Sequence, residues 1–334
     1  MKSPKTGNVM SLMKEVRNMT FRKEEFQIVY HYYLCNDSNE QFTSTELDEL
    51  NLQQLYNQYR DKHNLPFPEQ VQETREMYGL PANKMSEILG FGVNSYRNYE
   101  NDEVPVHANG KLILLASDPK KFKELVELSE TLDEKLKQKL FVKIDHLIQT
   151  NLQNKFSLNL ENYLLDGSQP DEFTGYKKPN LKKLTEMVVF FTERLEPWKT
   201  QMNKLLFYSD FHHFKNNCFS ITGTRYRAIE MGPVPYNYDS LFEYLANKNE
   251  IKICTTEFPN GSIGEQFKPQ TKRTFDNSLF CETELEVLET VSKKFKGLKP
   301  SDLIELSHTE IGWKENKEDK KIISYKYAFE LIQL

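Results

Sequence analysis

Residues 83–102, NKMSEILGFGVNSYRNYEND, constrain the fold most, because they have the spacing of a helix-turn-helix. Gly90 allows a sharp turn between two helical segments, and Gly92 is expected to open the second one. The apolar and aromatic positions recur at three- and four-residue spacing and should face inward: Met85, Ile88, Leu89, Tyr96 and Tyr99. The sequence therefore predicts two short helices joined by a tight turn.

The opposite face of the second predicted helix carries side chains suited to contact with DNA bases. This set consists of Val93, Asn94, Arg97 and Asn98. In the major groove, Asn can pair with adenine and Arg with guanine through two hydrogen bonds each, and Val can touch a thymine methyl group. We expect these four residues to bind DNA. The alternative is a helical hairpin within a core, whose polar face is simply solvated.

Charge argues against strong non-specific binding to nucleic acid. The 334 residues include 44 basic and 49 acidic side chains, for a net charge of −5. Phosphate contacts normally supply much of the affinity for DNA. Because the chain has few basic side chains to spare for phosphate contacts, we expect it to bind DNA as a homodimer. Backbone amides at helix N-termini should contribute to the phosphate contacts.

The N-terminal segment has the outline of a zinc knuckle without most of its ligands. In KSPKTGN, Ser3 and Thr6 stand where two cysteines would bind, and in CNDS Cys35 is followed by Ser38 in place of a third. A structural zinc ion needs four ligands, usually thiolates and imidazoles. Even with His31 the set falls short, so we predict a hydrogen-bonded turn, no metal ligands and no cofactor.

Hydrophobic periodicity and breaker residues divide the chain into five predicted segments. Residues 9–34 alternate like a hairpin, 44–63 read as a helix, and Gly, Pro and polar residues concentrate at 166–180. The segments are a degenerate zinc-ribbon-like domain at 1–65, a helix-turn-helix domain at 66–117, a helical connector at 118–165 that could mediate a dimer contact, a linker at 166–180, and a C-terminal domain at 181–334. The fold class is mainly α with small β elements (α+β).

The C-terminal domain contains acids and histidines that could suggest an enzyme. The candidates for a metal or acid/base cluster are Asp210, His213, His308 and Glu310. However, the chain has no nucleophile motif, no phosphate loop and no C-x2-C pair. We favour buried hydrogen bonds between helices, and expect no enzyme activity and no catalytic residues. A metal-dependent hydrolase is the less favoured alternative.

Compartment can also be predicted from the sequence. The four cysteines lie far apart, the N-terminus is polar, and no apolar run reaches the length of about 18 residues that a membrane span needs. We expect a cytoplasmic protein without a membrane partner.

Residues 1 to about 115 resemble the MqsA/YgiT-type antitoxins, on the knuckle, the hairpin and LPFPEQVQETREMYGLPANKMSEILGFGVNSYRNYENDEVP. That resemblance implies a zinc ribbon followed by an Xre-like helix-turn-helix, in which Val93, Asn94, Arg97 and Asn98 meet the bases. The ribbon's ligand positions depart from the family, since three of the four are Ser or Thr.

The region from about 178 to 334 is similar to the Panacea domain, also called the SocA-type antitoxin domain. The similarity rests on KLLFYSDFHHFKN, SITGTRYRAIEMGPVPYNY and LSHTEIGWKEN. It implies a type II antitoxin that neutralises a neighbouring toxin through this domain and represses its own operon, with the toxin and operator DNA as partners. A stand-alone transcriptional regulator is the alternative.

Residues 221–229 read as a strand, followed by a rigid turn at Gly232, Pro233 and Pro235. Arg and Tyr side chains near this strand and turn are the candidates for toxin binding, because these residue types most often anchor interfaces. They are Arg225, Arg227, Tyr236 and Tyr238. Tyr236 and Tyr238 could equally cover the core.

Overall fold

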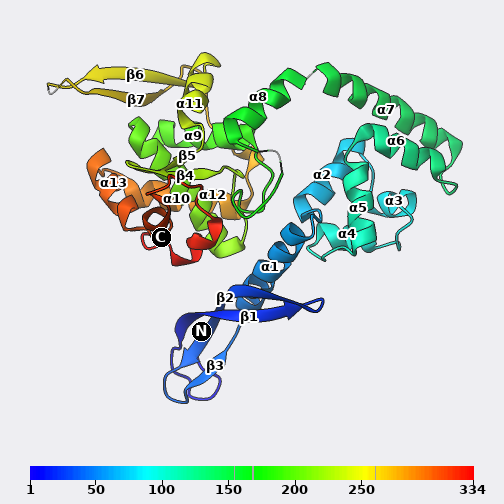
Figure 1. Ribbon diagram of the computed structural model, residues 1–334, viewed down its shortest axis with the longest axis horizontal. Coiled ribbons are helices and arrows are strands. Elements are labelled where there is room, and N and C mark those ends of the chain that lie inside the picture. The colour runs from blue at the N-terminus through cyan, green and yellow to red at the C-terminus, as the bar shows by residue number, and fades with distance from the viewer. Residues whose placement is uncertain (154, 168, 260) are drawn as a thin grey trace. The chain divides into compact units, whose positions relative to one another are not determined.

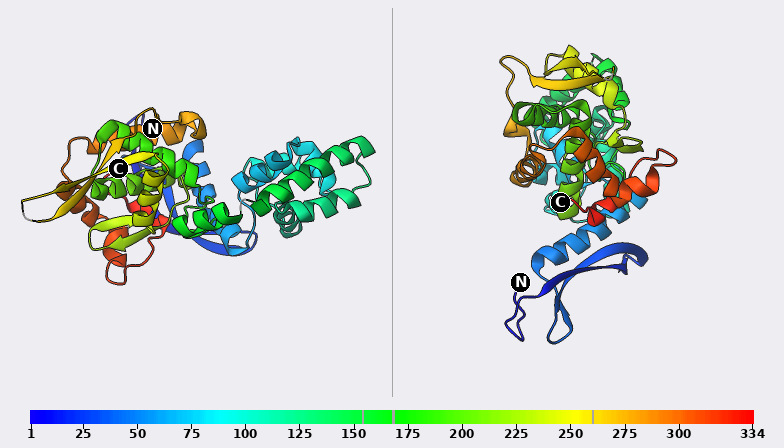
Figure 2. Two further views of the ribbon diagram at one scale, coloured as in Figure 1. Left: turned by 90° about the horizontal axis from the view of Figure 1, so that it is seen from above. Right: turned by 90° about the vertical axis from the view of Figure 1, so that its left-hand side faces the viewer.

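The computed structural model describes residues 1–153, 155–167, 169–259 and 261–334 (Figures 1 and 2). The chain forms two compact units, Met1–Asn159 and Leu160–Leu334. Helices predominate and the sheets are small and antiparallel, which confirms the predicted fold class. No described helix combines the length and the apolar composition required to cross a membrane.

The first unit begins with a three-stranded antiparallel sheet in the order β1 (Ser11–Phe21), β2 (Glu24–Cys35) and β3 (Glu40–Phe42). The predicted hairpin is confirmed, with Phe21 paired to Glu24 across a two-residue turn. Arg22 and Lys23 occupy that turn at φ values of 48° and 70°. Two positive φ angles in succession match the right-handed twist of a hairpin, although Asn and Gly adopt them more easily.

Helix α1 (Thr45–Lys62) packs on β2 and confirms the helix predicted at 44–63, with Ser44 as its N-cap. Amide side chains on one face of α1 bond the backbone of β2. Gln54 bonds both N–H and C=O of Val29, at 2.9 and 2.8 Å, and Asn51 bonds those of His31, at 2.8 and 3.0 Å. Gln58 donates to the carbonyl of Gln27 at 2.9 Å. Three amides of a helix thus bond alternate residues of the strand, where β3 does not reach.

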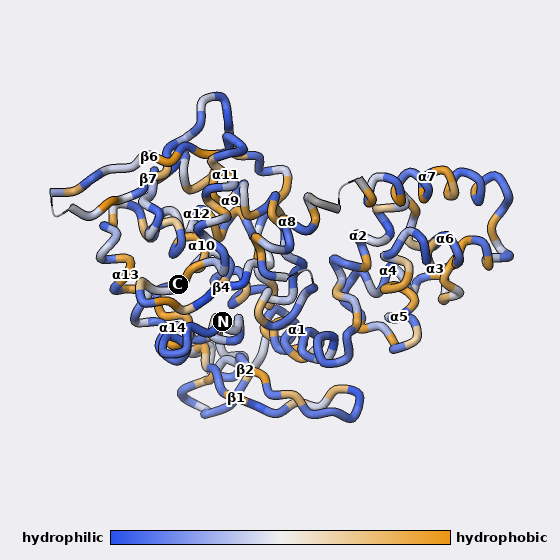
Figure 3. The backbone as a smooth tube through the Cα atoms, turned by 45° about the horizontal axis from the view of Figure 1, so that its top comes forward, coloured by the Kyte–Doolittle hydropathy of each residue, from blue (hydrophilic) through white to orange (hydrophobic). Residues whose placement is uncertain are grey.

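The remaining helices of the first unit share one core. They are α2 (Pro68–Tyr78), α3 (Ala82–Ile88), α4 (Ser95–Glu100), α5 (His107–Ala116), α6 (Pro119–Leu128) and α7 (Glu134–Gln153). Phe122 of α6 stacks on Tyr78 with ring centroids 3.8 Å apart, and Ile144 of α7 is fully buried. Hydrophobic and hydrophilic segments alternate along α7, as Figure 3 shows. Much of the predicted connector at 118–165, namely α6 and α7, therefore shares a core with α2 to α5.

The change from the first unit to the second falls within α8 (Lys155–Leu165), before the linker predicted at 166–180. Ser168 of that linker lies outside the described residues. Residues further along pack inside the second unit instead, because Thr174 and Tyr176 are buried and the Ser220 hydroxyl donates to the Thr174 carbonyl at 2.7 Å. Composition predicted a linker here, but the turn residues serve to fold this segment against the domain.

The second unit is built around α10 (Lys199–Asn217), which is buried over most of its length. Its other elements are α9 (Leu181–Leu195), β4 (Tyr226–Ile229), β5 (Gly232–Pro235), α11 (Tyr238–Asn247), β6 (Ile251–Glu257), β7 (Ile263–Pro269), α12 (Glu282–Phe295), α13 (Pro300–Thr309), α14 (Ile311–Asn316) and 3-10 turns at Asn277–Leu279 and Tyr325–Glu330. The pairs β4–β5 and β6–β7 are separate antiparallel hairpins. Strand β4 begins five residues later than the sequence predicts.

Candidate functional site

The segment predicted as a helix-turn-helix forms the short helices α3 and α4, and its predicted inward residues are buried as expected. Tyr96 is fully buried and Tyr99 is 5% exposed, and the Tyr96 hydroxyl donates to the carbonyl of Val71 at 2.8 Å. The hydroxyl of Ser86 in α3 accepts from the backbone N–H of Tyr96 at 3.1 Å. These bonds fix α4 against α2 and α3.

The predicted DNA-binding residues all lie on the surface: Val93, Asn94, Arg97 and Asn98. The second helix begins later than expected, since α4 starts at Ser95 and Asn94 is its N-cap. The Asn94 carbonyl accepts the first helical bond, from the N–H of Asn98 at 3.0 Å, so Val93 and Asn94 belong to the turn before the helix. The four side chains remain accessible in this arrangement, and Val93 is 74% exposed.

Ion pairing near α4 leaves the exposed Arg97 available for an external partner. Glu100, at the end of α4, is paired with Arg75 through a 2.5 Å contact, so its charge is neutralised. In the parts of the chain that the structure describes, Arg97 joins no ion pair. A free guanidinium beside a neutralised carboxylate can bind a phosphate or the edge of a guanine.

The predicted toxin-binding residues surround the β4–β5 hairpin, and each is only partly exposed: Arg225, Arg227, Tyr236 and Tyr238. Arg225 pairs with Asp171 within the unit. The guanidinium of Arg227 lies 5.1 Å from the ring centre of Tyr236. Arg225 is therefore occupied by an internal partner, whereas Arg227 and Tyr236 form a stacked pair on the surface of the hairpin.

The β4–β5 hairpin is tightly packed at Gly232. Gly232 has φ of +95°, and a Cβ atom there would lie 2.4 Å from the Ser307 hydroxyl oxygen and 2.7 Å from Cε of Lys204. Pro233 and Pro235 follow in β5. Lys204 is fully buried beneath this turn, its Nζ 3.3 Å from the carbonyl of Pro233, and burial lowers its pKa to about 7.

Asp210 organises the loop before β4. Its carboxylate accepts from the N–H groups of Ile221 and Thr222, both at 2.8 Å, and from the hydroxyls of Thr222 and Tyr226, at 2.6 and 2.7 Å. Burial raises its pKa to about 6, against the opposing effect of these bonds. The loop is held by a carboxylate, which is why residues 221–225 do not extend the strand.

The other residues considered for catalysis have separate surroundings. Glu310 accepts from the Tyr208 hydroxyl at 3.1 Å and from the N–H of Ile332 at 2.9 Å, and the ring of His308 stacks on Trp313 with centroids 3.8 Å apart. Within the described residues, these side chains do not join His213 as a group of metal ligands. Asp210 and Glu310 instead form the buried hydrogen bonds that the sequence favours.

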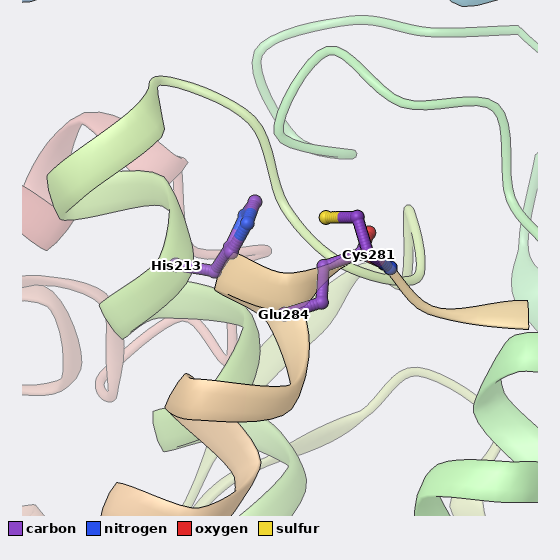
Figure 4. Close-up of side chains that lie close together, drawn as sticks. All are labelled: His213, Cys281 and Glu284. Carbon is purple, nitrogen blue, oxygen red and sulfur yellow. The ribbon is translucent and has the colours of Figure 1, made fainter. Parts of the chain in front are cut away.

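The structure does group His213 with two residues that no sequence motif indicated. Potential ligand atoms of His213, Cys281 and Glu284 all lie within 4.8 Å of one another (Figure 4). His213 comes from α10, and the other two from the start of α12. Burial lowers the pKa of His213 to about 4, so its ring is neutral. In the sequence, the three-residue spacing of Cys281 and Glu284 was the available signal of a ligand pair. That spacing indicates a metal site only when the distant His213 is known to lie beside it.

The predicted knuckle is a hydrogen-bonded turn, as expected. The Ser3 hydroxyl accepts from the N–H groups of Lys5 and Thr6, both at 3.3 Å. The Thr6 hydroxyl lies 3.5 Å from the sulfur of Cys35. Hydrogen bonds from Ser3, Ser38 and Thr6 lower the pKa of Cys35 to about 6. The four positions that the sequence compares with zinc ligands therefore converge, as three hydroxyl groups around one thiol.

Residues 202–314 match the family model described as antitoxin SocA-like, Panacea domain. The match begins within α10, runs through both hairpins, α11, α12 and α13, and ends within α14. None of the curated proteins compared with the chain matches it.

Proposed function

We propose that this chain is the antitoxin of a type II toxin-antitoxin pair. The observation that carries the proposal is the Panacea domain of the SocA-like antitoxin family at residues 202–314. The second unit binds and neutralises a toxin encoded by the adjacent gene, and the first unit represses the shared operon through its helix-turn-helix.

The stacked pair of Arg227 and Tyr236 is the part of the second unit best suited to contact the toxin. A partly exposed guanidinium beside a tyrosine ring offers both charge and apolar area. The turn at Gly232 and Pro233 holds the pair with little flexibility, so little conformational entropy would be lost on binding.

Growth rescue tests neutralisation. Expression of the adjacent gene alone should arrest growth, and co-expression of the full chain should restore it. The double variant Arg227→Ala, Tyr236→Ala should fail to restore growth while remaining folded by circular dichroism. Lys252→Ala, an exposed substitution on β6, serves as the matched control and should rescue as well as the wild type. If the adjacent product is harmless, the chain is a regulator without a toxin.

Operator binding tests the role of the first unit. Asn94→Ala and Arg97→Ala should each cost about 1–3 kcal/mol at the operator by removing base contacts. Both variants should still rescue growth, because neutralisation belongs to the other unit. Asn83→Ala, at an exposed position of α3 outside the candidate set, is the control for DNA affinity. Wild-type affinity in both test variants would mean that another surface reads the DNA.

A further inference from the structure

We propose that His213, Cys281 and Glu284 form a binding site for a divalent transition metal, with zinc as the natural occupant. The site goes beyond the proposed antitoxin function and stands independently of it. It joins the start of α12 to the C-terminal part of α10. Figure 4 shows the three side chains facing a common space between these elements.

The histidine is prepared for a metal by the bond on its other ring nitrogen. Nδ1 of His213 lies 2.7 Å from the carbonyl oxygen of Phe219. A carbonyl only accepts, so the proton of the neutral ring is on Nδ1 and the lone pair is on Nε2. Histidine ligands in metalloproteins are commonly oriented through such a bond to a backbone carbonyl. The side chain is 4% exposed, which holds the ring in this position.

The Thr283 hydroxyl bridges two of the donor atoms. Its oxygen lies 3.3 Å from Nε2 of His213 and 3.2 Å from the sulfur of Cys281. A single hydroxyl can contact both only because the imidazole and the thiol converge on one point. The same convergence lets one cation contact both.

The third donor is a buried carboxylate. Glu284 is 3% exposed, accepts from the backbone N–H of Cys281 at 2.9 Å, and contacts Lys183 at 2.6 Å. The bond to Cys281 places carboxylate and thiol at the same helix start. When no metal is bound, the positive charge of Lys183 compensates the negative charge of Glu284. When a metal is bound, the negative charges of Glu284 and of the Cys281 thiolate balance the cation.

The donor set selects the class of metal. One imidazole nitrogen, one sulfur and one carboxylate oxygen suit Zn²⁺, whereas Ca²⁺ and Mg²⁺ prefer oxygen ligands throughout. Three protein ligands leave the fourth tetrahedral position to water, and Cys281 is exposed, so solvent can reach it. On binding, the metal–sulfur bond replaces the S–H bond and the proton passes to solvent.

Cobalt(II) substitution in the full chain tests the site. Chelator-treated protein titrated with Co²⁺ should show one-to-one binding and a thiolate-to-cobalt charge-transfer band, both reversed by Zn²⁺. Loss of an outer partner already costs about 10–100-fold in metal affinity. Cys281→Ala should therefore abolish the band and weaken binding by at least about 100-fold. Because Cys281 is exposed, this variant should stay folded.

Matched cysteine variants separate this site from the rest of the chain. Cys254→Ala on β6 and Cys35→Ala in the knuckle should both retain the band and the affinity. Glu284→Gln, which keeps an acceptor for the Cys281 N–H, should retain the band but weaken binding by about tenfold or more. Failure to bind equimolar Co²⁺, a band that persists in Cys281→Ala, or a band lost in Cys35→Ala would each overturn the proposal.

Discussion

Cys35 is the one thiol among the four positions that the sequence compares with zinc ligands. It is buried, and hydrogen bonds from Ser3, Ser38 and Thr6 lower its pKa from the ordinary value of 9.0 to about 6. A thiol whose pKa is lower in the folded chain stabilises the fold above pH 9. That contribution is lost as pH falls from 9 toward 6.

We therefore expect Cys35→Ser to flatten the pH dependence of stability between pH 9 and pH 6. The measurement is the melting temperature of the two full-length proteins across that range. Lys204, whose pKa burial lowers to about 7, changes stability in the same direction, but it does so equally in both proteins. The difference between them isolates Cys35, and parallel curves would show that its thiolate has no stabilising role.

For individual residues, the local sequence pattern predicted which side chains are buried better than it predicted which residues contact one another. Burial of Tyr96 and exposure of Arg97 follow from helical periodicity and are confirmed. The partner of Asp210 is a loop eleven or more residues away, and Cys281 meets a histidine on another helix. Such contacts depend on how elements pack, which a periodic pattern does not encode.

At the scale of elements, the β1–β2 turn offers a matched pair of substitutions. Lys23 is exposed and has φ 70°, a backbone conformation that is strained for a residue with a Cβ atom but not for glycine. Lys23→Gly should therefore stabilise the first unit by about 0.5–1 kcal/mol. Arg22 has φ 48°, but it donates to the carbonyls of Val104 and Pro105 at 2.6 and 2.8 Å. Arg22→Gly should therefore stabilise less, or destabilise. Chemical denaturation measures both, and equal effects would rule out the bonds from Arg22.

The helices and the first hairpin were predictable because their signals are local. Alternation predicted β1 and β2, and residues 44–63 were predicted as a helix with either Ser44 or Thr45 as its cap, of which the structure uses Ser44. The β6–β7 hairpin was not predicted, since its strands are mostly exposed and lack strong apolar alternation. Residues 169–180 look like a linker in composition, yet their glycine and polar residues fit turns packed on the domain.

For the whole molecule, the position of the unit boundary leads to a prediction about fragments. A fragment of residues 160–334 should fold cooperatively, whereas 178–334 should be less stable by at least about 3 kcal/mol. The shorter fragment loses the buried Tyr176, whose ring lies 5.9 Å from that of Phe214, and the ion pair of Asp171 with Arg225.

Urea denaturation of the two fragments, followed by circular dichroism, measures the difference. A third fragment that begins at residue 169 is the control, because it keeps these contacts and lacks residues 160–168, which include the buried Leu164 and Leu165 of α8. If 178–334 unfolds at the same urea concentration as 160–334, the segment before α9 is a tether and the boundary belongs near residue 180.

The amide groups of α1 have a consequence for how copies of the chain behave at high concentration. A strand edge with free N–H and C=O groups invites pairing with another chain, through domain exchange or fibril growth. Along this edge of β2, Gln54 and Asn51 bond both groups of Val29 and His31, and Gln58 bonds the carbonyl of Gln27. A second chain could pair there only by replacing bonds of equal strength, so it would gain almost nothing. Helix α1 also prevents the sheet from extending further on this side, because the outer face of a helix offers no free backbone N–H and C=O groups to a next strand. Gln and Asn side chains thus give this side of the sheet protection against aggregation without proline or charge.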